Sequence, residues 1–512
     1  MSLSQVHGVV LSGVSGAMVR VEVDISDGLP SVGVVGLPDA SVTESRWRAR
    51  CAIDSVGGRW PNRRITVSLS PAEVRKQGAG LDLPIAVGVL AADGQLPGAD
   101  LRDITFIGEL GLDGQVRPTR GALAGALAAR SAGIARIVVP TTTAREMSRI
   151  TGIRVIVADH LAHVVAVLTG ECPESELQPA APVGGESGPR GEPPDLRDVR
   201  GHAHARLALE VAAAGGHHLA LVGAPGVGKT VLAERLPGLL PDLDDDAALE
   251  VAAIHGVTSA PRPADEYQRP PMRSPHHSAS ASALLGSVHG ARVIPGAATL
   301  AHRGVLFLDE APEFARPALE GLRQPLESGW IWLGRSGWSG RLPASFQLVV
   351  AANPCPCGRR VGSGSECSCS PTSVRRYASR LSGPFMDRVD IRLPLSRPSD
   401  ADLLNVEAAE SSDRVRDRVV LARERSATRF AGLPWRINAA IPAGELRRTW
   451  WPDPSGAEIL RTLDRRATNL RGPDRVLRVA WSLADLAGRS RPAADDIAAA
   501  LGLRGESTAW AP

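Results

Sequence analysis

The chain has 512 residues, more than one ordinary hydrophobic core organises, and its length suggests about three domains of roughly 100–200 residues each. Apolar residues make up 43% and charged residues 22% of the chain, which is typical of globular proteins and excludes a disordered chain or a coiled coil. No apolar run approaches the roughly 18 residues of a membrane span, and the first residues show no secretory signal. Six cysteines are too few for a disulfide scaffold. We therefore expect a soluble cytoplasmic protein with no membrane partner.

The net charge of +3 conceals an unusual use of basic residues: of 58, only Lys76 and Lys229 are lysines. A GC-rich coding bias explains this composition, and a lysine that persists against such a bias is a candidate for a role that arginine cannot fill. Residues 371–512 carry about six more basic than acidic side chains, and the rest is slightly acidic. This excess permits contact with nucleic acid, but a solvated arginine-rich surface would look the same.

A segment rich in Pro, Gly, Ser and Glu, residues 173–194, is predicted to be a linker because it offers almost nothing apolar to bury. Before it, residues 1–172 alternate short β-rich runs with helical stretches, which predicts an α/β domain. Residues 195–397 contain buried-type strands and predict an α/β core, whereas residues 398–512 show only helical patterns. The expected strands include residues 18–23, 65–69, 135–139, 218–222, 305–308 and 346–351, and the expected helices include residues 122–132 and 205–214.

The segment GAPGVGKT matches the P-loop pattern G-x-x-x-x-G-K-[ST] without a mismatch. Its glycines allow successive backbone N–H groups to face phosphate, and the following helix adds its positive end. Lys229 is placed to reach the β- and γ-phosphates, and the Thr230 hydroxyl to bind Mg²⁺. A chance glycine turn is the alternative, but a predicted strand precedes the loop and a helix-forming run follows it. The predicted ATP-binding residues of the loop are Gly223, Ala224, Pro225, Gly226, Val227, Gly228, Lys229 and Thr230.

Polar residues follow two later buried strands. Asp309 and Glu310 end the run VLFLDE, where Asp309 could hold Mg²⁺ through water and Glu310 could polarise the attacking water. Such a pair could also cap the next helix, but the P-loop upstream favours the catalytic interpretation. Asn353 follows the next strand and could orient the same water. Together these residues predict hydrolysis of a nucleoside triphosphate.

The segments GAPGVGKT, AHRGVLFLDEAPEF, LRQPLESG, AANPCPCG and SGPFMDRVD resemble the AAA+ ATPases of the magnesium-chelatase-like YifB/ComM group. The resemblance extends to VGLPDASVTESRWRAR near the N-terminus and RGPDRVLRVAWSLADLAG near the C-terminus. It implies a P-loop AAA+ α/β core and a C-terminal helical lid in a homo-hexameric ring, with active sites between subunits. It also implies that Asn353 is sensor 1, Arg388 the arginine finger and Arg478 sensor 2, where an arginine neutralises charge beside the γ-phosphate.

The N-terminal domain resembles the peptidase domain of Lon, a ribosomal S5 domain 2-like α/β fold. Peptidase chemistry there needs a Ser–Lys dyad. No serine stands at the expected place near Lys76, and this domain has no lysine after it. A dyad without its partners cannot form an acyl-enzyme, so we predict a non-proteolytic domain.

Four of the six cysteines, Cys355, Cys357, Cys367 and Cys369, fall within fifteen residues. Four thiolates can hold a structural Zn²⁺, although C-x-C pairs are less typical of such sites than C-x₂-C, and the thiols could equally stay free in a reducing cytoplasm. Adjacent His276 and His277 favour a packing or pore-insert role over a metal pair.

Residues 329–341 alternate tryptophan and aliphatic residues around glycines and predict a β-hairpin. Arg335 and Arg341 are candidate DNA contacts, since arginine could grip phosphates and tryptophan could stack on bases. Packing of the tryptophans on a neighbouring subunit is an equally good interpretation.

The sequence thus predicts an ATP- and Mg²⁺-dependent ring motor that acts on single-stranded or branched DNA, with branch migration or unwinding in recombination or natural transformation as the expected activity. One alternative is a chelatase-like chaperone ATPase that remodels a protein partner or assists metal insertion. Another is an ATP-gated DNA-binding scaffold without motor activity.

Overall fold

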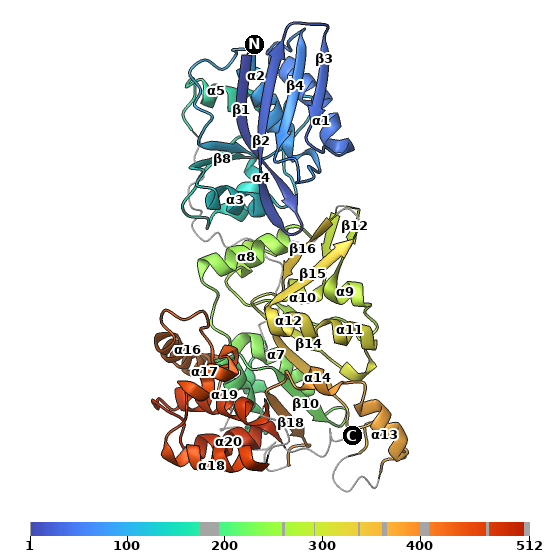
Figure 1. The fold of residues 1–512 in the computed structure, drawn as a ribbon, viewed down its shortest axis with the longest axis vertical. Coiled ribbons are helices and arrows are strands. Elements are labelled where there is room, and N and C mark those ends of the chain that lie inside the picture. The colour runs from blue at the N-terminus through green and yellow to red at the C-terminus, as the bar shows by residue number, and fades with distance from the viewer. Residues whose placement is uncertain are drawn as a thin grey trace.

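A computed structural model describes residues 2–174, 194–258, 262–290, 292–335, 338–360, 366–399, 409–466 and 471–505. Residues 175–193 of the predicted linker lie outside this description. The N-terminal part lies at one end of the long axis, and the P-loop part with the C-terminal helices beside it lies at the other (Figure 1). Among the described residues, no helix is long and apolar enough to cross a membrane.

A seven-stranded mixed sheet in the order β3-β4-β2-β1-β5-β8-β9 forms the N-terminal part. Its residues alternate between the two faces, as the period of a strand requires. One face, with Val6 and Val10 of the first strand, packs on the first two helices, while Val9 on the other face packs with the third. The elements are β1 Ser2–Ser12, β2 Ser15–Ser26, β3 Ser31–Val35, β4 Arg64–Ser70, β5 Ile104–Phe106, β6 Glu109–Leu110, β7 Val116–Arg117, β8 Arg136–Val139, β9 Arg154–Val157, α1 Ala40–Ser55, α2 Asp82–Ala92, α3 Ala122–Ser131, α4 Thr141–Ala144 and α5 Leu161–Leu168.

The P-loop part contains a five-stranded parallel sheet in the order β11-β14-β17-β10-β18. Its central strands are buried apolar runs, as expected for a parallel sheet covered on both faces. The strands are β10 Leu219–Gly223, β11 Met272–Arg273, β14 Val305–Leu308, β17 Gln347–Ala352 and β18 Ile391–Leu395, and hairpins are formed by β12 Gly286–His289 with β13 Arg292–Pro295 and by β15 Trp330–Arg335 with β16 Trp338–Pro343. The helices are α6 Ala203–Gly215, α7 Lys229–Leu239, α8 Asp245–Gly256, α9 Ala281–Leu285, α10 Ala297–Leu300, α11 Arg316–Gly321, α12 Arg323–Ser328, α13 Pro371–Ala378 and α14 Gly383–Met386.

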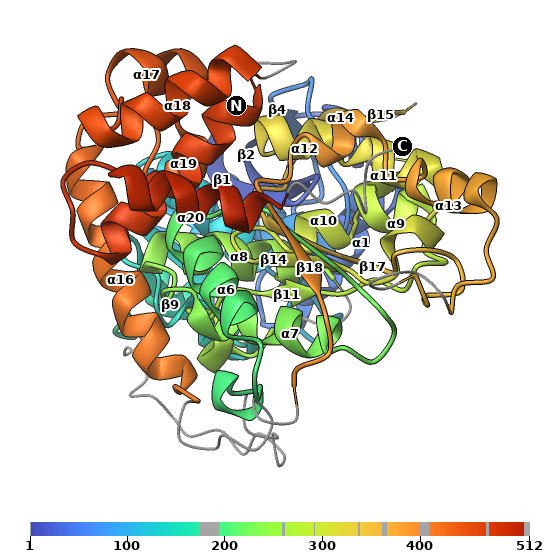
Figure 2. The same ribbon diagram turned by 90° about the horizontal axis from the view of Figure 1, so that it is seen from below.

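The C-terminal part is helical, and within residues 409–466 and 471–505 the structure shows no strand. Its apolar residues join those of α6 and α7 in one core cluster. Figure 2 shows these helices gathered on one side of the parallel sheet. They are α16 Ser412–Arg429, α17 Ala443–Arg448, α18 Pro454–Arg466, α19 Arg471–Leu486 and α20 Ala494–Arg504. The α/β class and the expected strands and helices are therefore confirmed, with ends that differ by one to a few residues.

Among the described residues, α3 of the N-terminal part packs its apolar face on α8 of the P-loop part. Arg130 of α3 forms an ion pair of 2.9 Å with Asp246 of α8. The turn between β1 and β2 packs on Trp338 of the second hairpin, where a Cβ at Gly13 would lie 2.8 Å from the indole. Trp338 therefore packs against its own chain, a third arrangement beside the two that the sequence suggested for the hairpin tryptophans.

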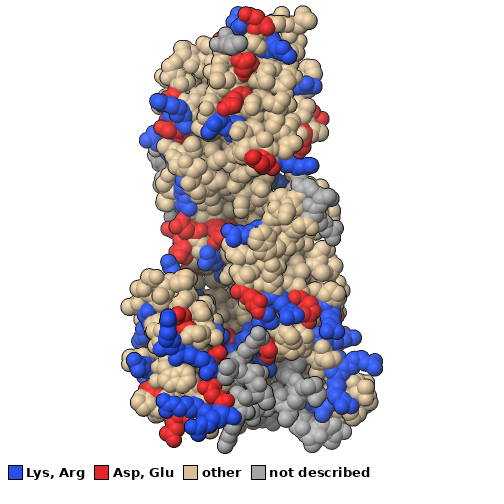
Figure 3. Space-filling model, viewed as in Figure 1, with Lys and Arg blue, Asp and Glu red and all other residues tan. Residues whose placement is uncertain are grey.

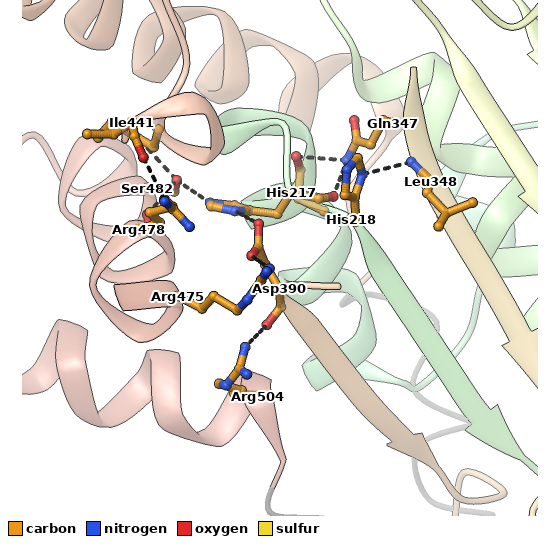
Figure 4. A network of polar contacts seen from close by, with 12 residues as sticks. His217, His218, Gln347, Leu348, Asp390, Ile441, Arg475, Arg478, Ser482 and Arg504 are labelled. Carbon is orange, nitrogen blue, oxygen red and sulfur yellow. Dashed lines mark hydrogen bonds and ion pairs between the residues drawn. The ribbon is translucent and has the colours of Figure 1, made fainter. Parts of the chain in front are cut away.

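A buried polar network joins the start of β10 and β18 to the C-terminal helices (Figure 4). His217 bonds to Asp390 at 2.9 Å through Nδ1 and to Ser482 at 2.8 Å through Nε2. Arg475 donates to the Asp390 carboxylate at 2.5 Å, and Arg504 to the Asp390 carbonyl at 3.2 Å. Burial alone would raise the pKa of Asp390, but the hydrogen bond from His217 and the charges of His217 and Arg475 hold it below its ordinary range.

We expect Asp390→Ala to lower the free energy of unfolding by about 3–5 kcal/mol, because Arg475 and His217 lose a buried partner. Since the folded pKa of Asp390 is depressed, its contribution is complete at neutral pH and declines as the pH falls below about 4. Urea unfolding at several pH values measures both effects. Asp413→Ala, at a side chain 77% exposed, is the control and should cost less than about 1 kcal/mol. If Asp390→Ala and Asp413→Ala lowered the free energy of unfolding equally, the structural role of the network would be contradicted.

Candidate functional site

The carboxyl ends of three neighbouring parallel strands bring the predicted catalytic residues together. β10 lies between β17 and β18, and β14 lies beside β17. The P-loop follows β10, Asp309 follows β14, and Asn353 follows β17. Because all these strands run in the same direction, the residues that follow them meet at one edge of the sheet.

Lys229, the first residue of α7, points back into its own loop. Its Nζ donates to the carbonyl oxygens of Gly223 at 2.7 Å and Ala224 at 2.8 Å, and to Oδ1 of Asn353 at 3.0 Å. Burial lowers the pKa of Lys229, and the charges of Asp309 and Glu310 oppose this shift. Gly228 turns the chain into α7 with φ of 95°, a conformation that favours glycine. The ammonium group of Lys229 is thus held at the centre of the loop that leads into α7.

The two residues predicted to hold Mg²⁺ are in direct contact. The Thr230 hydroxyl donates to Oδ2 of Asp309 at 2.7 Å, and the other oxygen of this carboxylate accepts from the backbone N–H of Glu310 at 2.8 Å. Hydroxyl and carboxylate oxygens are ligands of the type that Mg²⁺ takes in nucleotide sites. This donor set therefore fits the ion.

Glu310 has a partner that the sequence did not lead us to expect. Its Oε2 lies 3.1 Å from Nδ1 of His277, and its φ of 49° is unusual for a residue other than glycine. Such backbone conformations cluster at functional sites. The sequence predicts a packing or pore-insert role for His277, and no spacing in the sequence relates it to Glu310. The structure places it against the predicted catalytic carboxylate.

A pocket of about 470 Å³ lies beside the P-loop, between the segment before α6 and the end of β18. Arg200, His202, His204, Leu395 and Arg397 contribute to its lining. It borders the P-loop, because Leu395 pairs with Gly223 and a Cβ at Gly228 would lie 3.7 Å from Nε2 of His202. The motifs in the sequence did not point to this pocket.

Arg388 and Arg478 do not join Lys229 within the chain. They line a second pocket of about 330 Å³ at the opposite edge of the sheet, where β10 and β18 begin. Arg388 forms an ion pair with Glu327, and Nε of Arg478 donates to the Ile441 carbonyl at 2.9 Å. Arg475, a residue that the sequence analysis missed, lines the same pocket. Its spacing of three from Arg478 on α19 places both on one helix face and could have signalled it.

The second hairpin has the predicted antiparallel pairing, with Trp332 opposite Arg341. The Arg341 guanidinium lies 4.2 Å from the centre of the Trp330 ring, a cation–π contact. Trp332 is 60% exposed. The side chain of Arg335 lies outside the described residues. Arginines also gather over α13, at the lower right of Figure 3, where Arg375 and Arg376 are exposed.

The four clustered cysteines converge. Their Sγ atoms all lie within 4.8 Å of one another, and Cys355 is fully buried. Cys51 and Cys172, by contrast, are exposed and isolated. The cluster could therefore hold a metal ion.

Comparison with known proteins gives consistent matches along the chain. Residues 195–403 match the family described as magnesium chelatase, subunit ChlI, residues 21–143 match subunit ChlI of Mg-chelatase, and residues 409–504 match its C-terminal family. An uncharacterized protein of Mycobacterium tuberculosis is 46% identical over 508 residues, which cover 98% of this chain and 99% of the relative. The uncharacterized protein YifB of Escherichia coli is 42% identical over 95% of this chain and 94% of its own length. The competence protein ComM of Haemophilus influenzae is 38% identical over 98% of both chains.

The matched families cover most of the chain, and the relatives align with it over nearly their full lengths. The chain belongs to the YifB/ComM family of magnesium-chelatase-like proteins, a family of AAA+-type ATPases.

Proposed function

We propose that this protein hydrolyses ATP at the edge of the sheet where Lys229, Thr230, Asp309 and Asn353 meet. The observation that carries the proposal is the set of contacts from Lys229 to Asn353 and from Thr230 to Asp309. Lys229 supplies the cation for the β- and γ-phosphates, and Thr230 and Asp309 supply oxygen ligands for Mg²⁺. When bound, Mg²⁺ neutralises phosphate charge. Glu310 accepts a proton from the attacking water, and Asn353 orients that water.

The pocket beside the P-loop is the proposed site of the adenosine part of ATP. It lies against the loop at Gly228 and Leu395, so a nucleotide with its phosphates in the P-loop can extend into it. Its volume of about 470 Å³ is within the usual range of small-molecule sites.

We also propose a ring in which one subunit completes the site of the next. Arg388 and Arg478 share a pocket at the edge of the sheet opposite Lys229. The strand β10, at about 3.3 Å per residue, separates the two edges within a subunit. A second copy that places its P-loop against this pocket would bring the arginines to the phosphates. A homo-hexamer is the ring expected from the family resemblance.

DNA is the proposed substrate of the ring, with branch migration or unwinding as the activity. Two features support this proposal: the relative named a competence protein, and the exposed Trp332 beside Arg341 on the hairpin. A chaperone-like ATPase acting on a protein partner is the second candidate, which the magnesium chelatase families favour. Turnover stimulated by DNA supports the first, and turnover stimulated only by a protein supports the second.

Zn²⁺ is the proposed occupant of the four-cysteine cluster. Cysteine thiolates in a tetrahedral set are its usual ligands in structural sites, whereas Mg²⁺ prefers oxygen.

Trp332→Ala is expected to weaken the binding of DNA that stimulates ATP turnover. A stacked base contributes about 1–3 kcal/mol, so the DNA concentration that half-maximally stimulates ATP turnover should rise about 5-fold or more. Trp332 lines a pocket with Glu327 and Arg388, so stimulation by DNA is compared with the basal turnover of the same variant. ATPase assays with single-stranded DNA, and strand displacement on forked and four-way DNA, measure the effect.

Trp47→Ala is the matched control, because Trp47 is exposed to a similar extent, 56% against 60%. It lies on α1, in the N-terminal part, and should leave stimulation by DNA unchanged. If no DNA stimulated ATP turnover by the wild-type protein, the proposal that DNA is the substrate would be wrong.

A further inference from the structure

The cysteine loop begins two residues after Asn353, at the edge of the sheet that carries the proposed ATP site. Cys355 starts a tight turn in which its carbonyl accepts from the N–H of Gly358 at 3.0 Å. The loop ends at α13, whose first turn is capped by Ser370. Tyr377 on α13 lies near the start of the loop: burial raises the pKa of its phenol to about 12, and the nearby backbone of Asn353 opposes this shift. The described residues of the cysteine loop, 355–360 and 366–369, therefore lie between Asn353 and the capped start of α13.

Three of the four sulfur atoms have spacings close to those around one tetrahedral metal ion, and the fourth, of Cys369, lies within 4.8 Å of them. Cys355 and Cys357 are 3.3 Å apart at Sγ, and Cys367 lies 3.6 and 3.7 Å from them. Four sulfurs, each about 2.3 Å from a central zinc, lie about 3.8 Å from one another.

The turn that carries these sulfurs packs directly on the P-loop. Gly358 has φ of 75°, and a Cβ built on it would lie 2.5 Å from Cδ and 2.7 Å from Cγ of the Pro225 ring. Only a residue without a side chain allows this approach. Pro225 lies in the middle of the P-loop, and Lys229 at its end bonds to Asn353. The cysteine turn therefore supports the P-loop at Pro225 while flanking the residue that contacts Lys229.

We propose that a zinc ion held by Cys355, Cys357, Cys367 and Cys369 braces the P-loop of the same subunit. The ion fixes the turn that presses Gly358 on Pro225, and so fixes the backbone N–H groups that face phosphate. Nucleotide affinity then depends on the metal, although the metal touches no nucleotide. The inference rests on the proposed ATP and zinc sites and adds a coupling between them.

The first test is the metal content and nucleotide affinity of the full-length protein, purified without chelator. We expect one zinc per chain by elemental analysis in the wild type, and none in Cys367→Ser/Cys369→Ser. The dissociation constant of a fluorescent ATP analogue should rise about 10-fold or more in that variant, which corresponds to about 1.4 kcal/mol. Cys51→Ser/Cys172→Ser replaces the two exposed, isolated cysteines and should change neither quantity.

Two further measurements distinguish support of the P-loop by zinc from a general loss of folding. Removing zinc from the wild type with a chelator should weaken nucleotide binding, and added zinc should restore it. Gly358→Ala should keep zinc but weaken nucleotide binding, because its Cβ collides with Pro225. Gly444→Ala is the control, since a Cβ there meets nothing within 4 Å.

Each negative result identifies the statement that fails. Nucleotide affinity that is unchanged without zinc would overturn the brace and leave the ATP site standing. A wild type that holds iron, or takes up no zinc from zinc-containing buffer, would overturn the metal assignment. A zinc-loaded wild type that binds no nucleotide would overturn the proposed ATP function, and with it the brace.

Discussion

Glu310→Gln should bind ATP normally and hydrolyse it about 10²- to 10⁴-fold more slowly, the range for losing a general base. Glutamine keeps the size of the side chain but cannot accept the proton of the attacking water. Nucleotide binding should persist because Lys229, Thr230 and Asp309 keep their contacts with one another and with Asn353. A fluorescent nucleotide titration and a single-turnover assay separate the two steps.

Glu313→Gln is the matched control for this variant. Glu313 lies three residues away and pairs with Arg380 at 2.8 Å, an exposed ion pair outside the strand-end cluster. Loss of this ion pair in Glu313→Gln should change ATP turnover only slightly. Normal turnover by Glu310→Gln would refute the assignment of Glu310 as the base.

His277 is a residue beside Glu310 that the sequence alone could not identify as part of the site. It is 35% exposed and lies 3.1 Å from Glu310. An imidazole N–H at this distance can donate to the carboxylate and hold it in one orientation. His277 and Glu310 are far apart in the chain, so only the fold brings them together.

The strands at the centre of the site could be predicted because their signals are local. The runs that end at Gly223, Leu308 and Ala352 are short, apolar and followed by turn or polar residues. Parallel strands in one sheet align their carboxyl ends, so the residues after them meet without further information. The P-loop and the Asp309–Glu310 pair follow from that rule.

The remaining features depend on the order in which the strands and helices pack, which local patterns do not contain. The polar network at Asp390 joins the start of β18 to α19 and α20. In the chain, α16, α17 and α18 lie between β18 and these two helices. The pocket beside the P-loop combines residues before α6 with residues after β18. Arg478 was matched by motif position alone, and its location at the edge opposite Lys229 required the three-dimensional structure.

The position of Arg388 leads to the prediction about cooperation between subunits. Its guanidinium lies in the pocket at the start of β18 and pairs with Glu327, whereas Lys229 lies at the end of β10. Arg388→Ala should therefore bind ATP nearly as well as the wild type, because the cluster around Lys229 is intact. Turnover should fall about 10³-fold or more, as when an arginine finger is removed.

Mixing Arg388→Ala with Lys229→Ala at equal concentration distinguishes action in a neighbour's site from action in the subunit's own site. Each variant alone is expected to be inactive. In mixed rings, some interfaces pair the intact P-loop of an Arg388→Ala subunit with the intact arginine of a Lys229→Ala subunit, so activity should return. A mixture of Lys229→Ala with Glu310→Gln is the control, because both residues belong to the same strand-end cluster and every subunit then carries a damaged site. Native mass spectrometry establishes that mixed rings have formed. If such rings form and the first mixture stays as inactive as the control, Arg388 does not complete the site of a neighbouring subunit.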